Sequence, residues 1–386
     1  MASDAREYLP ETPEALTADW LSSALGVAID DVHRRPVGEG LGFMGDVLRL
    51  TLETDDPAAP ASVVAKIPRI ATRAMGEMLG VYEREIMFYR TLADAVPVRI
   101  PRLVYAGFDR DRGSENQEKI LRTLDRMPQF LLGAITALGA RVAAAKKRRY
   151  VLIIEDLAGM QPADQLAGLD EAGCSRVLTE IAPLHRAFWK SPQLDGHFWL
   201  LPLDVDARLR HNRFKQSRER FTALLGPELA DTLRWLDDHG EALSRRFVAD
   251  APATLSHCDL RLDNVMFDGD RCAFIDWQLL RRAPAAYDVA YFLSGALHED
   301  CEPAAEDRIL RRYHEVLDVA SYPFVAFHRD YQRAMLLNLA NLASADEVDL
   351  GNDRGSAMMA TWMRRLAARA RRIDPADTLR ESTRTT

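Results

Sequence analysis

The stretch at 256–279, SHCDLRLDNVMFDGDRCAFIDWQL, constrains the fold of this chain more than any other. Two short apolar runs flank an Asp-Gly-Asp sequence at 268–270, a pattern that predicts two antiparallel strands joined by a tight turn. A hairpin returns the chain to its starting point. We therefore expect Asn264, which precedes the first strand, to lie close to Asp276, which follows the second.

The polar residues of this stretch have the spacing used by enzymes that move the γ-phosphate of ATP. That reaction needs a carboxylate to orient the attacking hydroxyl and oxygen ligands to hold magnesium on the phosphates. Asp259 suits the first task, and Asn264 and Asp276 suit the second. Hard oxygen ligands without soft ones favour magnesium over zinc. Any one of these residues alone would be read as a turn residue, but the whole set at these offsets favours the site.

A lysine interrupts the apolar strand pattern at 63–67 and predicts an ion pair. A Lys in the interior of a strand is costly unless it is paired. The helical pattern at 82–89 follows, and it places both Glu83 and Glu85 within reach of Lys66. Upstream, the glycine-rich segment at 38–45 lies between two strand patterns, where glycine lets backbone N–H groups approach a phosphate closely.

Three segments resemble a known family: HCDL at 257–260, Asn264, and IDWQ at 275–278. They look like the catalytic and metal segments of the aminoglycoside phosphotransferase and choline kinase-like enzymes. The variant DLRLDN leans towards the branch of ecdysteroid kinase-like and related bacterial small-molecule kinases. Cys258 departs from aminoglycoside kinases, which usually carry Gly there. Trp-Gln at 277–278 in place of Phe-Gly, and the lack of an Ala-Pro-Glu segment, argue against a protein kinase.

The resemblance implies an α+β, bilobal protein-kinase-like fold. Residues 1–155 would form a small nucleotide-binding N-lobe with an antiparallel sheet and a helix. Residues 156–386 would form a larger, mainly helical C-lobe with the catalytic loop, the metal site and the acceptor site. An amphipathic insertion at about 113–146 would add two short helices to the N-lobe. This insertion packs on its own lobe, or it forms a dimer contact or a lid over the acceptor site.

The resemblance also implies a role for each site residue, with ATP and Mg²⁺ as cofactors. Asp259 would accept the proton of the acceptor hydroxyl, and Arg261 would neutralise the γ-phosphate during transfer. The family pattern selects Glu85 as the partner of Lys66, and Lys66 would hold the α- and β-phosphates. Gly40 and Gly42 would contact phosphate in the glycine-rich turn, and Glu155 would line the adenine pocket. Asn264 and Asp276 would be the two metal ligands, and Asp288 would support the catalytic loop.

Composition limits the partners of the protein. The formal net charge of −8 argues against nucleic-acid and anionic-membrane surfaces, which need concentrated Lys and Arg. No apolar run approaches a membrane span, and no signal peptide is apparent. The four cysteines form no CxxC pair, which is typical of reduced thiols in a cytoplasmic protein.

The sequence thus predicts an ATP-dependent phosphotransferase that acts on a hydroxyl of a small molecule. The alternative is a nucleotide-binding pseudokinase with a regulatory or interaction role. A purely structural helical protein would need five features in this order by chance: the glycine-rich loop, the lysine strand, the glutamate helix, the catalytic Asp and the metal Asp. The acceptor would be chosen by C-lobe helices, by the segment at 196–221, which we expect to be irregular, and by the C-terminal region. Acidic, basic and aromatic residues are mixed there, so the sequence does not identify the acceptor.

Overall fold

The computed structural model describes residues 8–37, 45–109, 114–128, 130–133, 135, 138–139, 141, 148–345 and 353–380. The chain divides into two compact units. The first unit comprises Met1–Gln117, Met127–Gln161 and Ala273–Leu279. The second comprises Glu118–Arg126, Pro162–Cys272 and Leu280–Thr386.

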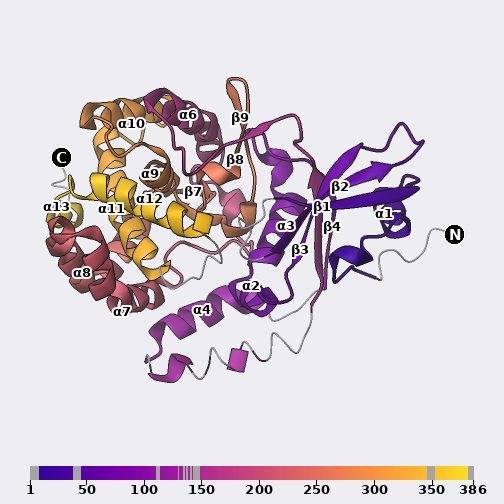
Figure 1. Cartoon of the computed structure of the whole chain (residues 1–386). Helices are drawn as coiled ribbons and strands as arrows, with labels where there is room; N and C mark the ends of the chain where they lie inside the picture. Colours follow the sequence, from indigo (N-terminus) through magenta and orange to yellow (C-terminus); the bar gives the residue numbers. More distant parts are fainter. Residues whose placement is uncertain are drawn as a thin grey trace. The chain divides into compact units, whose positions relative to one another are not determined.

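The first unit is built on a five-stranded sheet in the order β1-β2-β3-β5-β4, with every neighbouring pair antiparallel (Figure 1). Its strands are β1 (Asp31–Pro36), β2 (Gly45–Glu53), β3 (Ser62–Pro68), β4 (Leu103–Phe108) and β5 (Tyr150–Glu155). The unit also contains η1 (Pro13–Ala15), α1 (Ala18–Leu25), α2 (Arg73–Leu79), α3 (Val81–Thr91), η2 (Ala93–Ala95), η3 (Ser114–Asn116) and η7 (Trp277–Leu279). The antiparallel sheet expected from the sequence is confirmed.

The alternation of β3 assigns its side chains to two faces of the sheet. Val63, Ala65 and Ile67 are buried in one hydrophobic cluster with Trp20 and Leu21 of α1. The intervening residues point to the opposite face. Lys66 belongs to that second set, and its partner lies on α3. The strand therefore anchors its apolar side under α1 and presents its single lysine to α3.

The second unit is mainly helical, as expected. Its helices are α6 (Glu171–Ala187), α7 (Ala207–Leu225), α8 (Ala230–Asp250), α9 (Ala285–Ala296), α10 (Pro303–Leu317), α11 (Phe324–Ala345), α12 (Asp353–Ala370) and α13 (Pro375–Leu379). Short 3-10 turns are η4 (Pro192–Leu194), η5 (Pro227–Leu229) and η6 (Leu262–Asn264). All residues of α9 except Tyr291 are buried, because α9 packs against α11, α12, α6 and β7. α9 is therefore the core helix of this unit.

Short strands position the catalytic stretch. β7 (Ala253–Ser256) pairs antiparallel with β10 (Arg281–Pro284), and β6 (Gln161–Pro162), β8 (Val265–Asp268) and β9 (Arg271–Phe274) form a three-stranded sheet. The predicted hairpin is thus present, with Gly269 in its turn at a φ of +57°. A left-handed turn residue of this kind is what glycine supplies at no steric cost.

Two segments differ in detail from the sequence expectation. The segment at 196–221 is helical from Ala207 onward, so the expectation of an irregular segment is wrong for that part. The signal was weak because the buried apolar side chains described for this 19-residue helix, Ala207, Phe214 and Phe221, form a sparse stripe. The insertion begins with α4 (Gln117–Arg126), and residues Glu118–Arg126 group with the second unit. There the buried Asp125 accepts hydrogen bonds from the backbone N–H of Leu209 and from Arg245.

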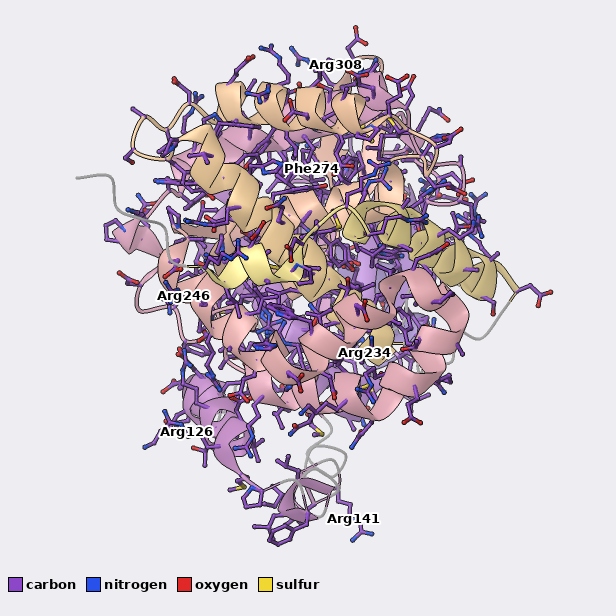
Figure 2. The ribbon with its side chains drawn as sticks, turned by 90° about the vertical axis from the view of Figure 1, so that its left-hand side faces the viewer. Arg126, Arg141, Arg234, Arg246, Phe274 and Arg308 are labelled. Atoms are coloured by element: carbon purple, nitrogen blue, oxygen red, sulfur yellow. The ribbon has the colours of Figure 1, made fainter. Side chains whose placement is uncertain are left out.

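The outer helices of the second unit carry charged surfaces. Figure 2 labels Arg234 and Arg246 on α8 and Arg308 on α10. Arg308 forms a bidentate pair with Glu171 of α6, with both N–O distances at 2.7 Å. Within the residues that the structure describes, no helix is both long and apolar enough to cross a membrane.

We expect Trp20→Ala to lower the free energy of unfolding by about 3–5 kcal/mol. The indole is buried in the cluster over β3, packs edge-on against Tyr105 at 5.2 Å and donates to the carbonyl of Tyr8. Denaturant unfolding measures the effect. Val325→Ala is the control, because that side chain is 75% exposed and its loss should change stability by less than about 0.5 kcal/mol. Equal effects of the two substitutions would contradict the assignment of this core.

Candidate active site

In the first unit, Lys66 lies between two carboxylates. Its Nζ is 2.7 Å from Oε1 of Glu85 and 2.9 Å from Oδ1 of Asp276. The ion pair expected between Lys66 and Glu85 is therefore present. Glu83 faces another partner, Arg148, at 3.0 Å. The two candidate glutamates therefore have different partners. Glu83 pairs with Arg148, and Glu85 pairs with Lys66.

Burial and charge act in opposite directions on this triad. Burial alone would lower the pKa of Lys66, but the carboxylates of Asp276 and Glu85 outweigh it and raise the pKa overall. Burial raises the pKa of Glu85, even though Lys66 acts in the opposite direction. The ammonium group is therefore firmly protonated at neutral pH.

The segment after β9 holds Asp276 against α3. Asp276 has a φ of +66°, a left-handed conformation that Asp tolerates better than most residues. The next residue, Trp277, donates its backbone N–H to Oε1 of Glu85 at 3.2 Å and stacks on Phe88 at a centroid distance of 4.7 Å. Gln278 donates to Oδ2 of Asp276 at 3.3 Å. Both oxygens of Asp276 are thus oriented by neighbours within the first unit.

A hollow of about 60 Å³ adjoins the triad, and its lining includes Lys66, Glu85, Asp276, Tyr82 and Gly45. Gly45 must be a glycine for a local reason, since a Cβ there would lie 2.8 Å from the carbonyl oxygen of Ile67. Gly40 and Gly42, which the sequence assigns to the phosphate turn, lie outside the described residues. Their role stays a prediction.

Glu155, which the resemblance assigns to the adenine pocket, is the last residue of β5. Its carboxylate accepts from Arg99 at 2.7 Å and from the backbone N–H of Arg102 at 3.1 Å. Burial would raise the pKa of Glu155, but these arginine contacts outweigh it and lower the pKa. The Glu155 carboxylate therefore already has hydrogen-bond partners within the first unit. Its contact with adenine stays a prediction.

In the second unit, the carboxylate of Asp259 is held at both oxygens. Oδ2 accepts from Nδ2 of Asn264 at 3.0 Å, and Oδ1 accepts from the hydroxyl of Tyr291 at 2.9 Å. Asn264 also donates from Nδ2 to the backbone carbonyl of Asp259 at 2.8 Å. Both oxygens of Asp259 that receive these hydrogen bonds are acceptors, so the NH₂ group of Asn264 must face them. Oδ1 of Asn264 is then the atom that can bind a cation.

This donor set fits a magnesium ion chemically. The amide Oδ1 of Asn264 and the carboxylate of Asp276 are both hard oxygen ligands. Asn264 belongs to the second unit and Asp276 to the first. The expectation that they approach one another and share a metal ion therefore stays a prediction.

Asp288 anchors the catalytic loop from α9, as the sequence resemblance implied. Its fully buried carboxylate accepts from the backbone N–H groups of His257 at 2.7 Å and Cys258 at 2.8 Å, and it lies 3.1 Å from Nε2 of His185. Cys258 has a φ of +60°. Glycine adopts that conformation without strain, which gives a physical reason for glycine at the same place in the resembling enzymes.

Arg261 is buried inside the loop rather than directed to solvent. Its guanidinium is 3.1 Å from Oδ2 of Asp263 and 3.7 Å from Oδ2 of Asp259, and it contacts the sulfur of Met358 on α12. It therefore compensates the charge of two loop carboxylates. The contact of Arg261 with the γ-phosphate stays a prediction.

Sequence reasoning missed Tyr291 and the orienting role of Gln278. Tyr291 follows Asp288 by three residues on α9, so both side chains lie on one helix face. Both also contact the catalytic loop. This spacing could have pointed to Tyr291 once Asp288 was placed. Gln278 was part of the recognised IDWQ sequence, but its hydrogen bond to Asp276 depends on a backbone conformation that the sequence does not reveal.

These features define a class of protein. The first unit has a five-stranded antiparallel sheet whose central lysine pairs with a helical glutamate. The second unit is mostly helical. Together they are an α+β kinase-like fold. Within that class, the chain belongs to the phosphotransferase enzyme family known as APH. The family profile matches residues 43–328, well over half of the chain.

Several solved structures are similar to this chain at low sequence identity. The GDP complex of aminoglycoside 2'-phosphotransferase-IIIa is 14% identical, covers 88% of this chain and 94% of that chain, and has a TM-score of 0.50. A microcompartment-associated aminopropanol kinase is 16% identical over 91% of this chain and 95% of that chain, with a TM-score of 0.48. Choline kinase from Cryptosporidium parvum Iowa II is 11% identical over 86% and 88%, with a TM-score of 0.46. No curated protein matches this chain in sequence.

We expect Asp288→Asn to destabilise the second unit by about 3 kcal/mol. An amide has one acceptor oxygen, so it cannot receive both backbone N–H groups and His185 as the carboxylate does. Denaturant unfolding measures the loss. Asp270→Asn is the matched control, because that side chain is 96% exposed and should contribute less than about 0.5 kcal/mol. An unchanged midpoint in Asp288→Asn would refute the anchoring role.

Proposed function

We propose that this protein is an ATP-dependent phosphotransferase that moves the γ-phosphate to a hydroxyl group of a small molecule. The observation that carries the proposal is the Lys66 triad with Glu85 and Asp276. Membership of the phosphotransferase family supports it, and so does the fold shared with a phosphotransferase solved as its GDP complex. Residues 1–155 would bind the nucleotide, and residues 156–386 would carry the catalytic loop and the acceptor.

Lys66 would hold the α- and β-phosphates. Its ammonium group carries three donors and already uses two of them on Glu85 and Asp276. These two contacts fix the direction of the side chain, so its remaining donor is oriented before the nucleotide arrives. Positioning and charge stabilisation of this kind account for most of the catalysis in phosphoryl transfer.

Asp259 would orient the acceptor hydroxyl and take its proton. In the transfer, the acceptor oxygen forms a bond to the γ-phosphorus, the bond from that phosphorus to the β–γ bridging oxygen breaks, and ADP leaves. The hydroxyl proton passes to the carboxylate of Asp259. The hydrogen bonds from Asn264 and Tyr291 fix the direction in which this carboxylate would meet the acceptor hydroxyl.

Asp276 and Oδ1 of Asn264 are the ligands that would hold Mg²⁺. The metal ion would supply positive charge that neutralises the phosphates during transfer. Arg261, held by Asp263 near Asp259, would add positive charge beside the transferring group. The pseudokinase alternative predicts the loss of one of these groups, but the lysine, the glutamate, the catalytic aspartate and both metal ligands are all present.

We expect Asp259→Asn to lower kcat by about 10²- to 10⁴-fold while the nucleotide still binds, because general-base catalysis contributes on that order. Asp276→Ala should lower kcat as well, and it should also lose the Mg²⁺-dependent part of its affinity for the nucleotide. ADP release and calorimetric nucleotide binding measure the two effects, with Asp270→Asn as the exposed control. Full turnover in Asp259→Asn would contradict the mechanism. Nucleotide binding by the wild type without any transfer would favour the pseudokinase.

Tyr291→Phe should lower kcat by about 2- to 10-fold, the kinetic equivalent of one hydrogen bond of about 0.5–1.5 kcal/mol. The substitution removes only the hydroxyl that orients Asp259, whereas the ring keeps its edge-on contact with Trp362 at 5.1 Å. Steady-state kinetics and the melting temperature check this together. A fall in kcat at unchanged melting temperature and unchanged KM for the nucleotide is expected. An unchanged kcat would remove Tyr291 from the mechanism.

A further inference from the structure

One glutamine that the sequence did not single out is buried against the catalytic loop. Gln165 lies in the short segment between β6 and α6, and only 1% of it is exposed. Its Oε1 accepts from the backbone N–H of Leu262 at 2.7 Å. Its own backbone N–H donates to Oδ1 of Asp263 at 3.3 Å. Gln165 therefore holds two consecutive residues of the catalytic loop.

These two residues lie among the groups that carry the proposed chemistry. Oδ2 of Asp263 accepts from Arg261 at 3.1 Å, and the guanidinium of Arg261 lies 3.7 Å from Oδ2 of Asp259. Asn264, which would bind Mg²⁺, ends the η6 turn that begins at Leu262. A displacement of this turn would therefore move a cation and a metal ligand together.

Both sides of the contact between Gln165 and Leu262 are buried. Leu262 is fully buried, and so is almost all of Gln165. If Oε1 were removed, the N–H of Leu262 would lose its acceptor in a place that water reaches poorly, and a buried donor in that state is costly. The turn would then shift towards another acceptor. The position of the turn therefore depends on Gln165.

The backbone of the segment around Gln165 is itself fixed by Arg365 of α12, which is only 3% exposed. The guanidinium of Arg365 donates to the carbonyl oxygens of Gln165 and Gly295, both at 2.7 Å. It also donates to those of Leu166 and Ala167, at 2.9 Å and 3.2 Å. Gly295 belongs to α9, so one arginine joins this segment to the core helix of the second unit.

The side-chain amide of Gln165 is confined by close packing. A Cβ at Gly295 would lie 2.4 Å from Nε2 of Gln165 and 3.1 Å from the ring of Trp362, so the glycine makes room for the amide. Nε2 is buried and forms no hydrogen bond with any residue that the structure describes. Packing alone would be served better by an apolar side chain, because an unpaired buried donor is unfavourable. The bond from Oε1 to the loop gives a reason for glutamine here.

We propose that Gln165 is a positioning residue of the catalytic loop, which keeps Arg261 and Asn264 where phosphoryl transfer would need them. It would act through Leu262 and Asp263 rather than on the reacting groups themselves. This inference rests on the proposed phosphotransferase function. It requires the accepting oxygen of the side chain, and a side chain of equal size without that oxygen would not replace it.

Gln165→Met tests this requirement, because methionine has a similar length and volume but no oxygen. Hydrogen–deuterium exchange of the full chain without nucleotide should be at least about tenfold faster in peptides covering 257–265 than in the wild type. Exchange in α10 should be the same in both proteins. Gln193→Met is the matched control, since Gln193 is exposed on η4. Wild-type exchange at 257–265 in folded Gln165→Met would overturn the inference.

Gly295→Ala approaches the same contact from α9. The added methyl group would displace the amide of Gln165, whereas alanine forms helix more readily than glycine. The same loop peptides should again exchange faster than in the wild type. This variant decides the question if Gln165→Met does not fold, and unchanged loop exchange in Gly295→Ala would then overturn the inference.

Kinetics and nucleotide binding connect the loop to the reaction. We would measure ADP release from Mg-ATP with pools of sugars, amino alcohols, hydroxy acids and aminoglycosides, and ATP binding by calorimetry at several Mg²⁺ concentrations. Gln165→Met should lower kcat about 10- to 100-fold, as misplaced reacting groups do. It should also raise the Mg²⁺ concentration at half-maximal ATP affinity, because Asn264 moves with the turn. A merely smaller share of folded protein would leave that concentration unchanged.

The outcomes separate the two proposals. Faster loop exchange in Gln165→Met with wild-type kcat and wild-type Mg²⁺ dependence would overturn the positioning role and leave the phosphotransferase intact. If the wild type released no ADP with any pool, the phosphotransferase would be refuted. The Mg²⁺ dependence of ATP binding would then still decide whether Gln165 positions Asn264.

Discussion

The structure of the first unit depends on placing one cation inside a sheet. Lys66 occupies a strand whose neighbouring residues are packed under α1, and burial of an unpaired ammonium group would be strongly unfavourable. Glu85 from α3 and Asp276 from the segment after β9 offset that cost. The same requirement explains why α3 faces this side of the sheet. It also explains why Trp277 stacks on α3 and donates to Glu85, since that contact keeps the second carboxylate in place.

The catalytic loop of the second unit depends on a comparable arrangement with the charges reversed. Asp288 is buried in α9 and receives two backbone N–H groups of the loop, which holds Cys258 in a left-handed conformation. Asp259 is then fixed by Asn264 and Tyr291. Strained backbone persists only where surrounding contacts over-determine it, and these contacts do so here. A rigid carboxylate is useful to a transferase because precise orientation of the reacting groups lowers the barrier.

The sequence patterns that point to the candidate site are mostly local. The hairpin, the lysine in its strand and the two candidate glutamates are short-range patterns. Features that depend on contacts between distant segments were harder to predict from the sequence. The helical character of α7 beyond Ala207 was missed because its apolar stripe is short, and the grouping of α4 with the second unit depends on contacts of Asp125 with residues 84 and 120 positions away.

The sequence by itself determined the class of chemistry, because phosphoryl transfer demands a few residue types at fixed spacing and each motif lies within about twenty-five residues or follows in a set order. Tertiary structure alone decided which hydroxyl orients Asp259 and which backbone N–H groups Asp288 receives, whereas the family pattern had already selected Glu85 as the partner of Lys66. Those choices depend on helix faces and on distances between segments far apart in the chain. Charge compensation in a buried place is a property of all neighbours at once, so no linear pattern reveals it.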